Sequence, residues 1–381
     1  MKKVVFIGGG AASITSAVYL KKREPSFDVT IVEKDKKIGR KLSLTGGGKC
    51  NIAPLKDDIN VYNNPNLVES LFNEISLEKY LSLLEYIGFK TKTIKDYGYY
   101  PVHESAPQVV KNLYHQMNKL GIKIIQDEFV DYFGDNNKVI VKLKNQELEA
   151  DYLILSTGGL SPLMKEVFNK HQIKTTKVLP GLCPLRVKED VSSLFGCRFE
   201  ANVALLYKDQ LVKEYFGEVQ FKKDGLSGIP TLNLSSEISR MMIKDNLSIS
   251  VFKVRISLPK EVVGNLQNST IEEACYMLFK EEYANYIIQK HHLNKKELMS
   301  KSVAEIISSE CFSISSLYDF ESAQVTVGGV SIDEIDKHFA LKQNKKVYVI
   351  GEALDIDGIC GGYNLRFAIS SGFEAVKSII K

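Results

Sequence analysis

Residues 4–16 read VVFIGGGAASITS, and this stretch decides the fold class. A short apolar run, rich in β-branched side chains, ends at three consecutive glycines, and apolar residues then recur at helical spacing from Ile14 to Leu20. This pattern predicts a strand, a tight turn and a helix. A second apolar run at 29–32 ends at Glu33, which completes a βαβ unit of the size that begins a dinucleotide-binding fold.

The glycines of this turn have separate roles in such a fold. Gly8 permits the turn out of the strand. Gly10 lets the main chain approach a pyrophosphate at the helix N-terminus, where free N–H groups and the helix dipole favour anions. The third position of the G-x-G-x-x-G pattern is Ser13, which is small enough to keep helix and strand close. Glu33 is placed to accept the hydroxyl hydrogens of an adenosine ribose and to repel a 2′-phosphate. The alternative is an ordinary glycine turn.

A second glycine triplet lies in the segment GRKLSLTGGGKCN, residues 39–51. It ends in Gly-Lys as a Walker A loop does, but that loop requires glycine at position 43 and serine or threonine at position 50, where this chain has Ser43 and Cys50. In flavin enzymes the segment after the ribose-binding strand loops back over the pyrophosphate and ribitol, and glycines keep side chains away from the flat ring. We therefore interpret the two triplets as two ends of one long cofactor site. A plain surface loop is the alternative.

Length and composition favour two domains and no membrane span. The 381 residues are 44% apolar, enough for one large core or two moderate ones, and the net charge of +4 permits an anionic partner without requiring one. The longest apolar runs are strand-sized, whereas a membrane span takes roughly 18 to 20 residues. The N-terminal apolar run leads straight into glycines, unlike a signal peptide. We expect a cytoplasmic protein.

Cysteine and histidine usage predicts neither disulfides nor a metal site. The six cysteines are scattered and include no CxxC pair. The six histidines include no HExxH motif.

Further elements continue the N-terminal domain. Helical patterns occur at 66–75, 77–87 and 106–120, and strand patterns at 122–126, 138–143 and 152–156. The last strand leads into Ser-Thr-Gly-Gly at 156–159, which is either a third cofactor contact or a plain turn.

The middle of the chain is predicted to be an inserted domain. Residues 186–260 alternate polar and apolar, as antiparallel strands do, and residues 271–309 are helical and charged in pattern. A further strand of the nucleotide-binding type, KVYVIGE at 346–352, appears only after this block. The predicted domains are therefore a dinucleotide domain made of residues 1–185 and 324–381, and an insert made of residues 186–323.

The C-terminal stretch adds a glycine loop and a final helix. Apolar and small residues recur at helical steps from Leu365 to Ile379, directly after Gly361 and Gly362. The amide-rich start of this helix would stabilise negative charge on a reduced flavin. Glu352 ends the preceding strand, where its carboxylate would hold ribitol hydroxyls.

Together these motifs resemble the bacterial flavoproteins known as the BaiN/YhiN-like, or HI0933-like, NAD(P)/FAD-dependent oxidoreductases. The resemblance spans nearly the whole chain and rests on IGGGAAS, GRKLSLTGGGKCN, GYYPVHESA, STGG, GLSG, TVGGVS and GEALDIDGICGGYNLRFA, in that order. It implies an α/β fold with a discontinuous FAD-binding Rossmann domain of the glutathione-reductase type and an inserted β-barrel plus helical domain.

The resemblance also implies which residues contact FAD. They are Gly8, Gly10, Ala11, Ala12, Ser13, Glu33, Lys34, Arg40, Lys41, Thr45, Gly46, Cys50, Asn51, Thr157, Gly158, Gly351, Glu352, Asp357, Gly362, Tyr363 and Asn364. Three departures from the family's motifs occur at 98–101, 221–229 and 339–343, where an arginine, a histidine and a TMESK motif are missing. All three lie outside the flavin-cradling motifs, so they bear on the substrate.

A bound FAD implies electron or hydride transfer through the ring's N5. Cys360 and Cys50 are the candidate catalytic proton donors because both lie in cofactor loops; the alternative is that they are packing thiols. Tyr100 and Tyr363 are candidates for stacking or hydrogen bonding near the ring, against the alternative of ordinary core aromatics.

Three functions are compatible with these features. The first is reduction of an activated C=C bond, in a small enone or in the uracil ring of ribosomal RNA, with NADH or NADPH as electron donor. The second is oxidation of small amines. The third is a non-catalytic flavin-binding or RNA-binding module. The sequence does not determine the oligomeric state.

Overall fold

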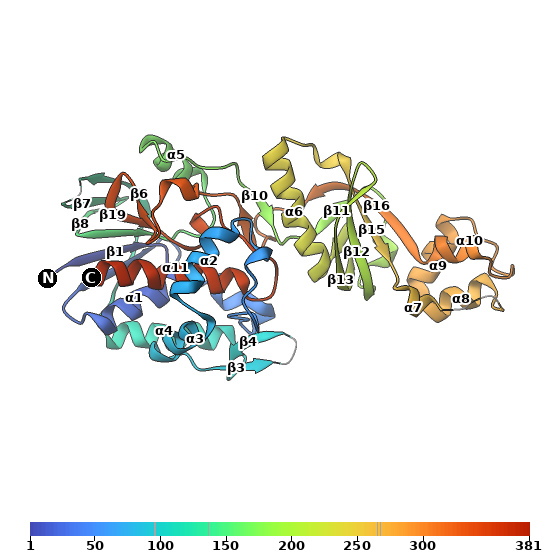
Figure 1. The fold of residues 1–381 in the computed structure, drawn as a ribbon, viewed down its shortest axis with the longest axis horizontal. Helices are drawn as coiled ribbons and strands as arrows, with labels where there is room; N and C mark the ends of the chain where they lie inside the picture. The colour runs from blue at the N-terminus through green and yellow to red at the C-terminus, as the bar shows by residue number, and fades with distance from the viewer. Residues whose placement is uncertain (95–96, 136, 265, 267) are drawn as a thin grey trace. The chain divides into compact units, whose positions relative to one another are not determined.

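The computed structural model describes residues 1–94, 97–135, 137–264, 266 and 268–381, and the chain divides into two compact units (Figure 1). Unit 1 comprises Met1–Val178 and Thr326–Lys381, and unit 2 comprises Leu179–Val325. Unit 2 is thus inserted into unit 1. The boundaries expected from the sequence, 185/186 and 323/324, lie a few residues away from these.

Unit 1 is built on a six-stranded sheet in which all neighbours are parallel except the first pair. In spatial order its strands are β18 (Ala340–Leu341), β19 (Asn344–Val349), β9 (Tyr152–Leu155), β1 (Lys3–Ile7), β2 (Asp28–Glu33) and β5 (Lys123–Gln126). The central strands are apolar almost throughout, as β1 shows with Val4 to Ile7 all buried. Strands buried on both faces take this continuous apolar pattern, which is why β1 is recognisable in the sequence.

Two helices pack against each other beside this sheet. They are α1 (Ala11–Arg23) and α11 (Tyr363–Ile380), which lie side by side in Figure 1 and make extensive contacts. Their approach is close because Gly372 has no side chain: a Cβ there would lie 2.0 Å from Ser16 Oγ. The first and last helices of the chain thereby join the two separated parts of unit 1.

The remaining elements of unit 1 surround this core. The helices are α2 (Pro65–Glu74), α3 (Leu77–Tyr86), α4 (Ala106–Lys119) and α5 (Pro162–Lys170). The short strands are β3 (Thr91–Ile94) and β4 (Gly98–Pro101), which form a hairpin, and β6 (Phe129–Gly134), β7 (Val139–Leu143) and β8 (Glu147–Ala150), which form a three-stranded antiparallel sheet. At the boundary between the units lie β10 (Leu179–Gly181) and β17 (Val325–Val327).

Unit 2 contains a closed antiparallel barrel. Its strands are, in order around the barrel, β11 (Leu185–Val187), β14 (Gly225–Ser227), β13 (Gln210–Lys222), β12 (Arg198–Tyr207), β15 (Phe252–Ser257) and β16 (Ser309–Leu317). β15 alternates strictly, with Phe252, Val254 and Ile256 buried inside and polar residues between them. This period of two is what the sequence displayed. The predicted fold class, a Rossmann-type domain with an inserted barrel and helices, is confirmed.

The helices of unit 2 include one that the sequence pattern did not predict. Residues 229–245 were expected to be strand, but they form α6 (Ile229–Asp245). Two of its buried serines bond the chain before β11: Ser236 Oγ accepts from Leu182 N, and Ser239 Oγ donates to Pro180 O. The other helices are α7 (Lys260–Val263), α8 (Ile271–Leu278), α9 (Glu281–Lys290) and α10 (Lys301–Ile307).

None of the helices in the described ranges has the length and apolar character needed to cross a membrane.

Candidate cofactor site

The carboxyl ends of four parallel strands meet at one edge of the unit 1 sheet. Ile7 at the end of β1 lies opposite Val32 of β2 and Leu155 of β9, and Leu155 lies opposite Val349 of β19. The segments that follow these strands therefore start side by side. Ligands of open α/β sheets bind at this edge.

The first glycine triplet connects β1 to α1, and its outer glycines face different surroundings. Gly8 has a φ of +94°, and a Cβ there would lie 2.6 Å from Ser156 O, so this glycine is required by packing. Gly10 is the N-cap of α1, and a Cβ there would meet nothing within 4 Å. No side chain caps α1, and its first turn holds no acidic residue, so its amides are available to an anion.

The serine at the third fingerprint position is part of a buried contact. Ser13 Oγ hydrogen-bonds Ser156 Oγ, which also donates to Ile7 O at 3.0 Å. Ser13 thus ties α1 to the end of β9 as well as being small. Glu33 lies beside the same turn and accepts from Gly9 N at 2.6 Å and from Asp35 N at 2.9 Å. A carboxylate has about four acceptor positions, so Glu33 retains capacity for a ribose hydroxyl.

The second glycine triplet forms an irregular 3₁₀ segment, Leu42–Gly48. Gly46, Gly47 and Gly48 all have positive φ. A Cβ on Gly46 would lie 2.6 Å from Asn51 N, whereas Gly47 and Gly48 face open space. The segment is anchored on α4, since a Cβ on Gly39 would lie 2.8 Å from Val110 Cγ1. This triplet therefore presents bare main chain on a supported loop.

Glu352 brings three segments together beyond the end of β19. Its Oε1 accepts from Thr326 N at 2.9 Å and lies 3.5 Å from Lys41 Nζ, which belongs to the second glycine segment. Cβ atoms on Gly158 and Gly159 would lie 3.7 Å and 3.2 Å from its carboxylate oxygens. The turn after β9 is thus adjacent to Glu352.

The C-terminal glycine loop meets the second triplet through Asn51. Gly362 is the N-cap of α11, again without a side-chain cap, and a Cβ there would lie 2.7 Å from Asn51 Oδ1. A Cβ on Gly98 in β4 would lie 2.9 Å from the same atom. The loop itself is closed by Asn364, which accepts from Gly358 N and donates to Gly358 O, both at 2.9 Å.

Two buried polar atoms along this path have no hydrogen-bond partner among the described residues. They are Asn51 Oδ1 and Thr157 Oγ1. Buried polar groups nearly always have partners, so these two atoms are available to a bound polar molecule. With two uncapped helix starts and bare glycines at Gly10, Gly47 and Gly48, the residues fit a long nucleotide cofactor such as FAD.

We call the loops at 8–13, 39–51, 156–159 and 351–364 the cradle. The predicted site residues differ in how deeply they are buried in it. Tyr363 and Asn364 begin α11, the buried Asp357 lies in the loop before it, and Gly351 packs against Ala12 of α1. Lys34 and Arg40 are exposed at the rim, where Arg40 Nε lies 3.3 Å from Asp35 Oδ2.

The two candidate thiols are poor proton donors as they stand. Burial raises the pKa of Cys50 to about 11, and a hydrogen bond with Thr45 offsets this only in part. Burial raises the pKa of Cys360 to about 12. Cys50 is near enough to the buried Tyr80 phenol to help raise its pKa, which places this thiol beside α3. Tyr100 is also buried, and burial raises its pKa.

Sequence reasoning missed a buried ion pair behind the cradle. Arg366 in the first turn of α11 is fully buried and pairs with Asp57. Its spacing from Ile369 and Phe373 puts it on the buried face of the helix, and an arginine in such an apolar stripe is the signal that was available.

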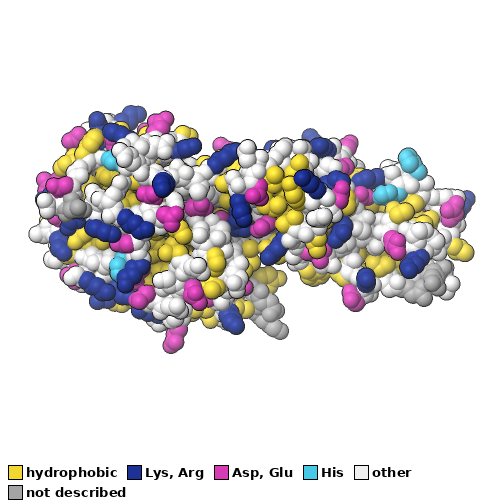
Figure 2. Space-filling view, turned by 45° about the horizontal axis from the view of Figure 1, so that its top comes forward, with side chains coloured by type: hydrophobic (Ala, Val, Ile, Leu, Met, Phe, Trp, Pro, Cys, Tyr) yellow, Lys and Arg dark blue, Asp and Glu magenta, His cyan; other side chains and the backbone are white. Residues whose placement is uncertain are grey.

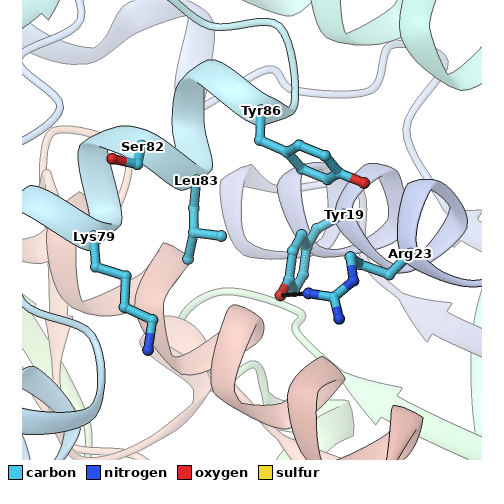
Figure 3. A pocket seen from close by; sticks show the side chains of 6 residues that line it. All are labelled: Tyr19, Arg23, Lys79, Ser82, Leu83 and Tyr86. Atoms are coloured by element: carbon cyan, nitrogen blue, oxygen red, sulfur yellow. Dashed lines mark hydrogen bonds between the residues drawn. The ribbon is translucent and has the colours of Figure 1, made fainter.

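A surface pocket of about 210 Å³ lies away from these loops (Figure 3). It is lined by α1 and α3, and Arg23 Nη1 donates to Tyr19 Oη there at 3.2 Å. At about 1.5 Å per helical residue, Tyr19 is about 13 Å along α1 from Gly10. This pocket therefore does not belong to the cradle.

The face in Figure 2 carries Lys and Arg side chains interspersed with Asp and Glu. The mixture agrees with the small net charge of +4.

A protein family matches almost the entire sequence. The family described as "HI0933-like protein Rossmann domain" matches residues 2–378. The chain belongs to the HI0933-like family.

Two curated relatives of this HI0933-like protein are similar over nearly their whole length. The 3-dehydro-bile acid delta(4,6)-reductase of Clostridium scindens is 26% identical over 406 residues, covering 98% of each protein. The ribosomal RNA dihydrouridine synthase of Haemophilus influenzae is 27% identical over 402 residues, also covering 98% of each.

Solved structures share the fold at low identity. A 3-ketosteroid delta1-dehydrogenase from Sterolibacterium denitrificans has a TM-score of 0.51 at 11% identity, covering all of this HI0933-like protein and 99% of that chain. A flavocytochrome c3 fumarate reductase in its open conformation has a TM-score of 0.50 at 14% identity, covering all of this chain and 79% of the other. Both comparisons bear on the fold alone.

Proposed function

We propose that this protein is an FAD-dependent oxidoreductase that reduces an activated C=C bond. The observation that carries the proposal is the meeting of four side-chain-poor segments, 8–10, 46–48, 158–159 and 361–362, around the unpartnered atoms Asn51 Oδ1 and Thr157 Oγ1. Packing accounts for some of these glycines, but Gly10, Gly47 and Gly48 have open space where a side chain would be, as the binding of a long, partly flat cofactor would require.

The cradle offers a group for each part of FAD. The free amides of α1, from Ala11 to Ser13, hold the pyrophosphate, and Glu33 accepts from the adenosine ribose. Glu352, Thr157 and Asn51 are available to the ribitol and the ring. FAD, when bound, supplies hydride transfer through its N5.

The start of α11 contributes electrostatic stabilisation. Its first amides follow Gly362 without competition from a capping side chain. They favour negative charge placed at that helix end, which is what a flavin acquires on reduction.

The relatives suggest the acceptor. The Clostridium scindens relative is named as a reductase of a bile acid derivative and the Haemophilus influenzae relative as a dihydrouridine synthase of ribosomal RNA. The first name favours a small enone and the second a uracil ring, and both describe addition of hydrogen across a conjugated C=C bond. We take the small enone as the first candidate, NADH or NADPH as the donor, and the cytoplasm as the location.

Proton delivery is assigned to a group other than the two thiols. An efficient general acid has a pKa near the working pH, and those of Cys50 and Cys360 lie at about 11 and about 12. Burial also raises the pKa of Tyr100, so the same argument counts against its phenol, and water is left as the proton source.

An anaerobic titration tests the proposal. Purified protein reconstituted with FAD would be mixed with NADH or NADPH while the flavin absorbance is followed, and then with an enone panel or with ribosomal RNA. We expect bleaching by a nicotinamide and recovery of the colour on adding an enone.

The other outcomes separate the alternatives. Recovery with ribosomal RNA alone would assign the uracil ring, and loss of RNA binding at higher salt would support that result. Bleaching only by an amine would replace the proposal with amine oxidation. A bound flavin that no donor bleaches would indicate a non-catalytic module.

A further inference from the structure

Arg366 is held by an unusually complete set of partners. It is 0% exposed, and its guanidinium donates to Asp57 from Nε at 3.2 Å and from Nη2 at 3.0 Å. Nη2 also donates to Ile75 O at 2.6 Å, and Nη1 donates to Ser370 Oγ.

Two aromatic rings complete this environment. The guanidinium carbon lies 4.0 Å from the centre of the Phe72 ring and 4.5 Å from that of Tyr80. The guanidinium thus contacts side chains of α2 and α3 while belonging to α11.

Stability alone does not account for a charge at this position. A cation in the first turn of a helix opposes the helix dipole, and burying it requires loss of its hydration. Apolar residues of similar volume often stabilise a protein as well as a buried ion pair does. The pair is therefore better explained by what it positions.

Asp57 and Asn51 belong to the same irregular segment, which precedes the short 3₁₀ helix Ile59–Val61. Tyr80 Oη donates to Ile52 O at 3.1 Å, so a ring that packs on Arg366 also holds the start of this segment. A Cβ on Gly362 would lie 2.8 Å from the Ala53 carbonyl carbon, which shows how tightly the segment is packed against the start of α11. One helical turn after Gly362, the ion pair between Arg366 and Asp57 holds the same segment to α11.

We propose that Arg366 and Asp57 form a positioning pair, which fixes Asn51 relative to the amide end of α11 and influences the electrostatic potential at the candidate cofactor site. The proposal rests on the proposed function to the extent that FAD is the bound cofactor. Neither residue needs to contact the flavin: Asp57 neutralises the Arg366 charge, and the bidentate geometry sets the distance between loop and helix.

The pair predicts shifts of opposite sign in the midpoint potential of bound FAD. Asp57→Asn leaves a buried positive charge uncompensated, which stabilises the reduced flavin and raises the potential. Arg366→Gln leaves the Asp57 carboxylate uncompensated and lowers the potential. The double variant should return towards the wild-type potential, and flavin reduction by NADH or NADPH should slow by up to about 100-fold in the single variants.

Matched variants separate charge from position. Tyr80→Phe removes the hydrogen bond to Ile52 O without changing charge, so it should weaken FAD binding and leave the potential unchanged. Arg366→Lys keeps the charge but loses the bidentate fork, so it should behave like Tyr80→Phe. Arg23→Gln, on an exposed arginine at the far end of α1, is the control and should match the wild type.

The experiment is spectroelectrochemical titration of the FAD-loaded full-length proteins, combined with fluorescence measurement of FAD affinity. Equal potentials in Asp57→Asn and Arg366→Gln, or shifts of the same sign, would overturn the positioning pair. If a charge-removing variant does not fold, Arg366→Lys and Tyr80→Phe decide, because wild-type FAD affinity in both would also overturn it. A wild type that binds no FAD would instead refute the proposed function.

Discussion

Gly8 and Gly10 are two residues apart but differ in how they tolerate a side chain. Gly8 has a φ of +94° and no room for a Cβ, because Ser156 O would lie 2.6 Å away. Gly10 has an ordinary extended backbone, with φ −84° and ψ −176°, and open space where its side chain would be. Gly8 is therefore needed by the fold, whereas packing in the protein does not require a glycine at position 10.

Alanine substitutions at these two glycines should separate folding from binding. Gly8→Ala should lower stability by ~1–3 kcal/mol because of backbone strain and the clash. Gly10→Ala should leave the melting temperature of the FAD-free protein unchanged or slightly higher, but weaken FAD binding by ~10-fold or more, about 1.4 kcal/mol. Differential scanning fluorimetry and FAD titration measure both quantities. An undiminished FAD affinity in Gly10→Ala would argue against a phosphate at the start of α1.

Asp131 is a buried carboxylate that joins β6 to the end of α5. It accepts hydrogen bonds from Lys170 Nζ, from His171 Nε2 at 2.9 Å and from Tyr132 N at 2.8 Å. Burial alone would raise the pKa of Asp131, but the hydrogen bonds from Lys170 and His171 outweigh it, so the pKa lies below its ordinary value. The folded state therefore stabilises the ionised form of the Asp131 carboxyl group.

This depressed pKa gives the stability contribution of Asp131 a defined pH range. Asp131→Asn should cost ~1–3 kcal/mol at pH 7, because Lys170 and His171 lose the charged acceptor that the buried Asp131 carboxylate provides. The contribution is fully present above the unfolded pKa of about 3.9 and is lost as pH falls through the lower folded value. In urea unfolding, the free energy of unfolding of Asp131→Asn should therefore lie well below that of the wild type at pH 7, and the difference should shrink below pH 4.

A surface carboxylate serves as the control for this experiment. Asp209 is 71% exposed and pairs with Lys253 at 2.7 Å, so Asp209→Asn should change stability by less than ~1 kcal/mol at either pH. A gap between Asp131→Asn and the wild type that does not depend on pH would contradict the assignment.

At the scale of elements, the crossing of α1 and α11 is the contact that unites unit 1. Ser16 of α1 is fully buried, and its hydroxyl has no hydrogen-bond partner among the described residues. It lies 2.0 Å from where a Cβ on Gly372 would be, and Ala12 O lies 3.2 Å from that point. The distance between the two helices is thus set by a glycine on α11 and a serine on α1.

A double-mutant cycle tests this contact. Gly372→Ala should destabilise by ~1–3 kcal/mol through overpacking against the Ser16 hydroxyl. Ser16→Ala should be neutral or stabilising, because it removes an unsatisfied buried hydroxyl. Combining the two should recover part of the Gly372→Ala loss, giving a favourable coupling energy in urea unfolding. Strict additivity would show that Ser16 does not limit the approach of the helices.

The same scale shows how far the sequence predicts the structure. Elements with a clear apolar pattern were predicted well: β1 is buried and apolar from Val4 to Ile7, and α11 carries apolar residues at helical spacing. α6 was read as strand because Thr231, Asn233, Ser235 and Ser239 interrupt its apolar positions. Ser235 and Ser239 are buried because they bond a neighbouring segment, and a single sequence does not reveal which segment that is.

The residues of the cradle were likewise predictable only where a local sequence pattern marked them. Its glycines are visible in the sequence because three of them stand together, and Glu33 is visible because it ends a strand. Glu352 was also predicted to end a strand, but β19 ends at Val349 and Glu352 lies in the short 3₁₀ segment that follows. The Arg366–Asp57 pair joins positions far apart in the chain, and its geometry emerges only when α11 packs on α2 and α3. Contacts between distant segments are what the sequence pattern leaves undetermined.

At the scale of the whole molecule, the two units have separate hydrophobic cores. The core of unit 1 includes Phe6 and Phe367 from opposite ends of the chain, and that of unit 2 includes Phe252 and Phe312 of the barrel. A domain with its own core is able to fold alone. The site residues described above all belong to unit 1.

The chain leaves and re-enters unit 1 at neighbouring points, which makes excision of unit 2 a feasible test. Thr176 N donates to Gly329 O at 2.8 Å, and Gly329 N donates to Thr176 Oγ1 at 2.9 Å, so the two crossing segments are hydrogen-bonded side by side. Replacing residues 179–325 with a short Gly/Ser linker should therefore join the two parts of unit 1 without straining its fold.

Because the proposed cradle lies entirely in unit 1, the shortened protein should melt cooperatively and bind FAD within about tenfold of the full-length affinity. The isolated 179–325 fragment should also melt cooperatively and bind no FAD. A shortened protein that folds, as judged by circular dichroism, but does not bind FAD would show that unit 2 supplies part of the cofactor site.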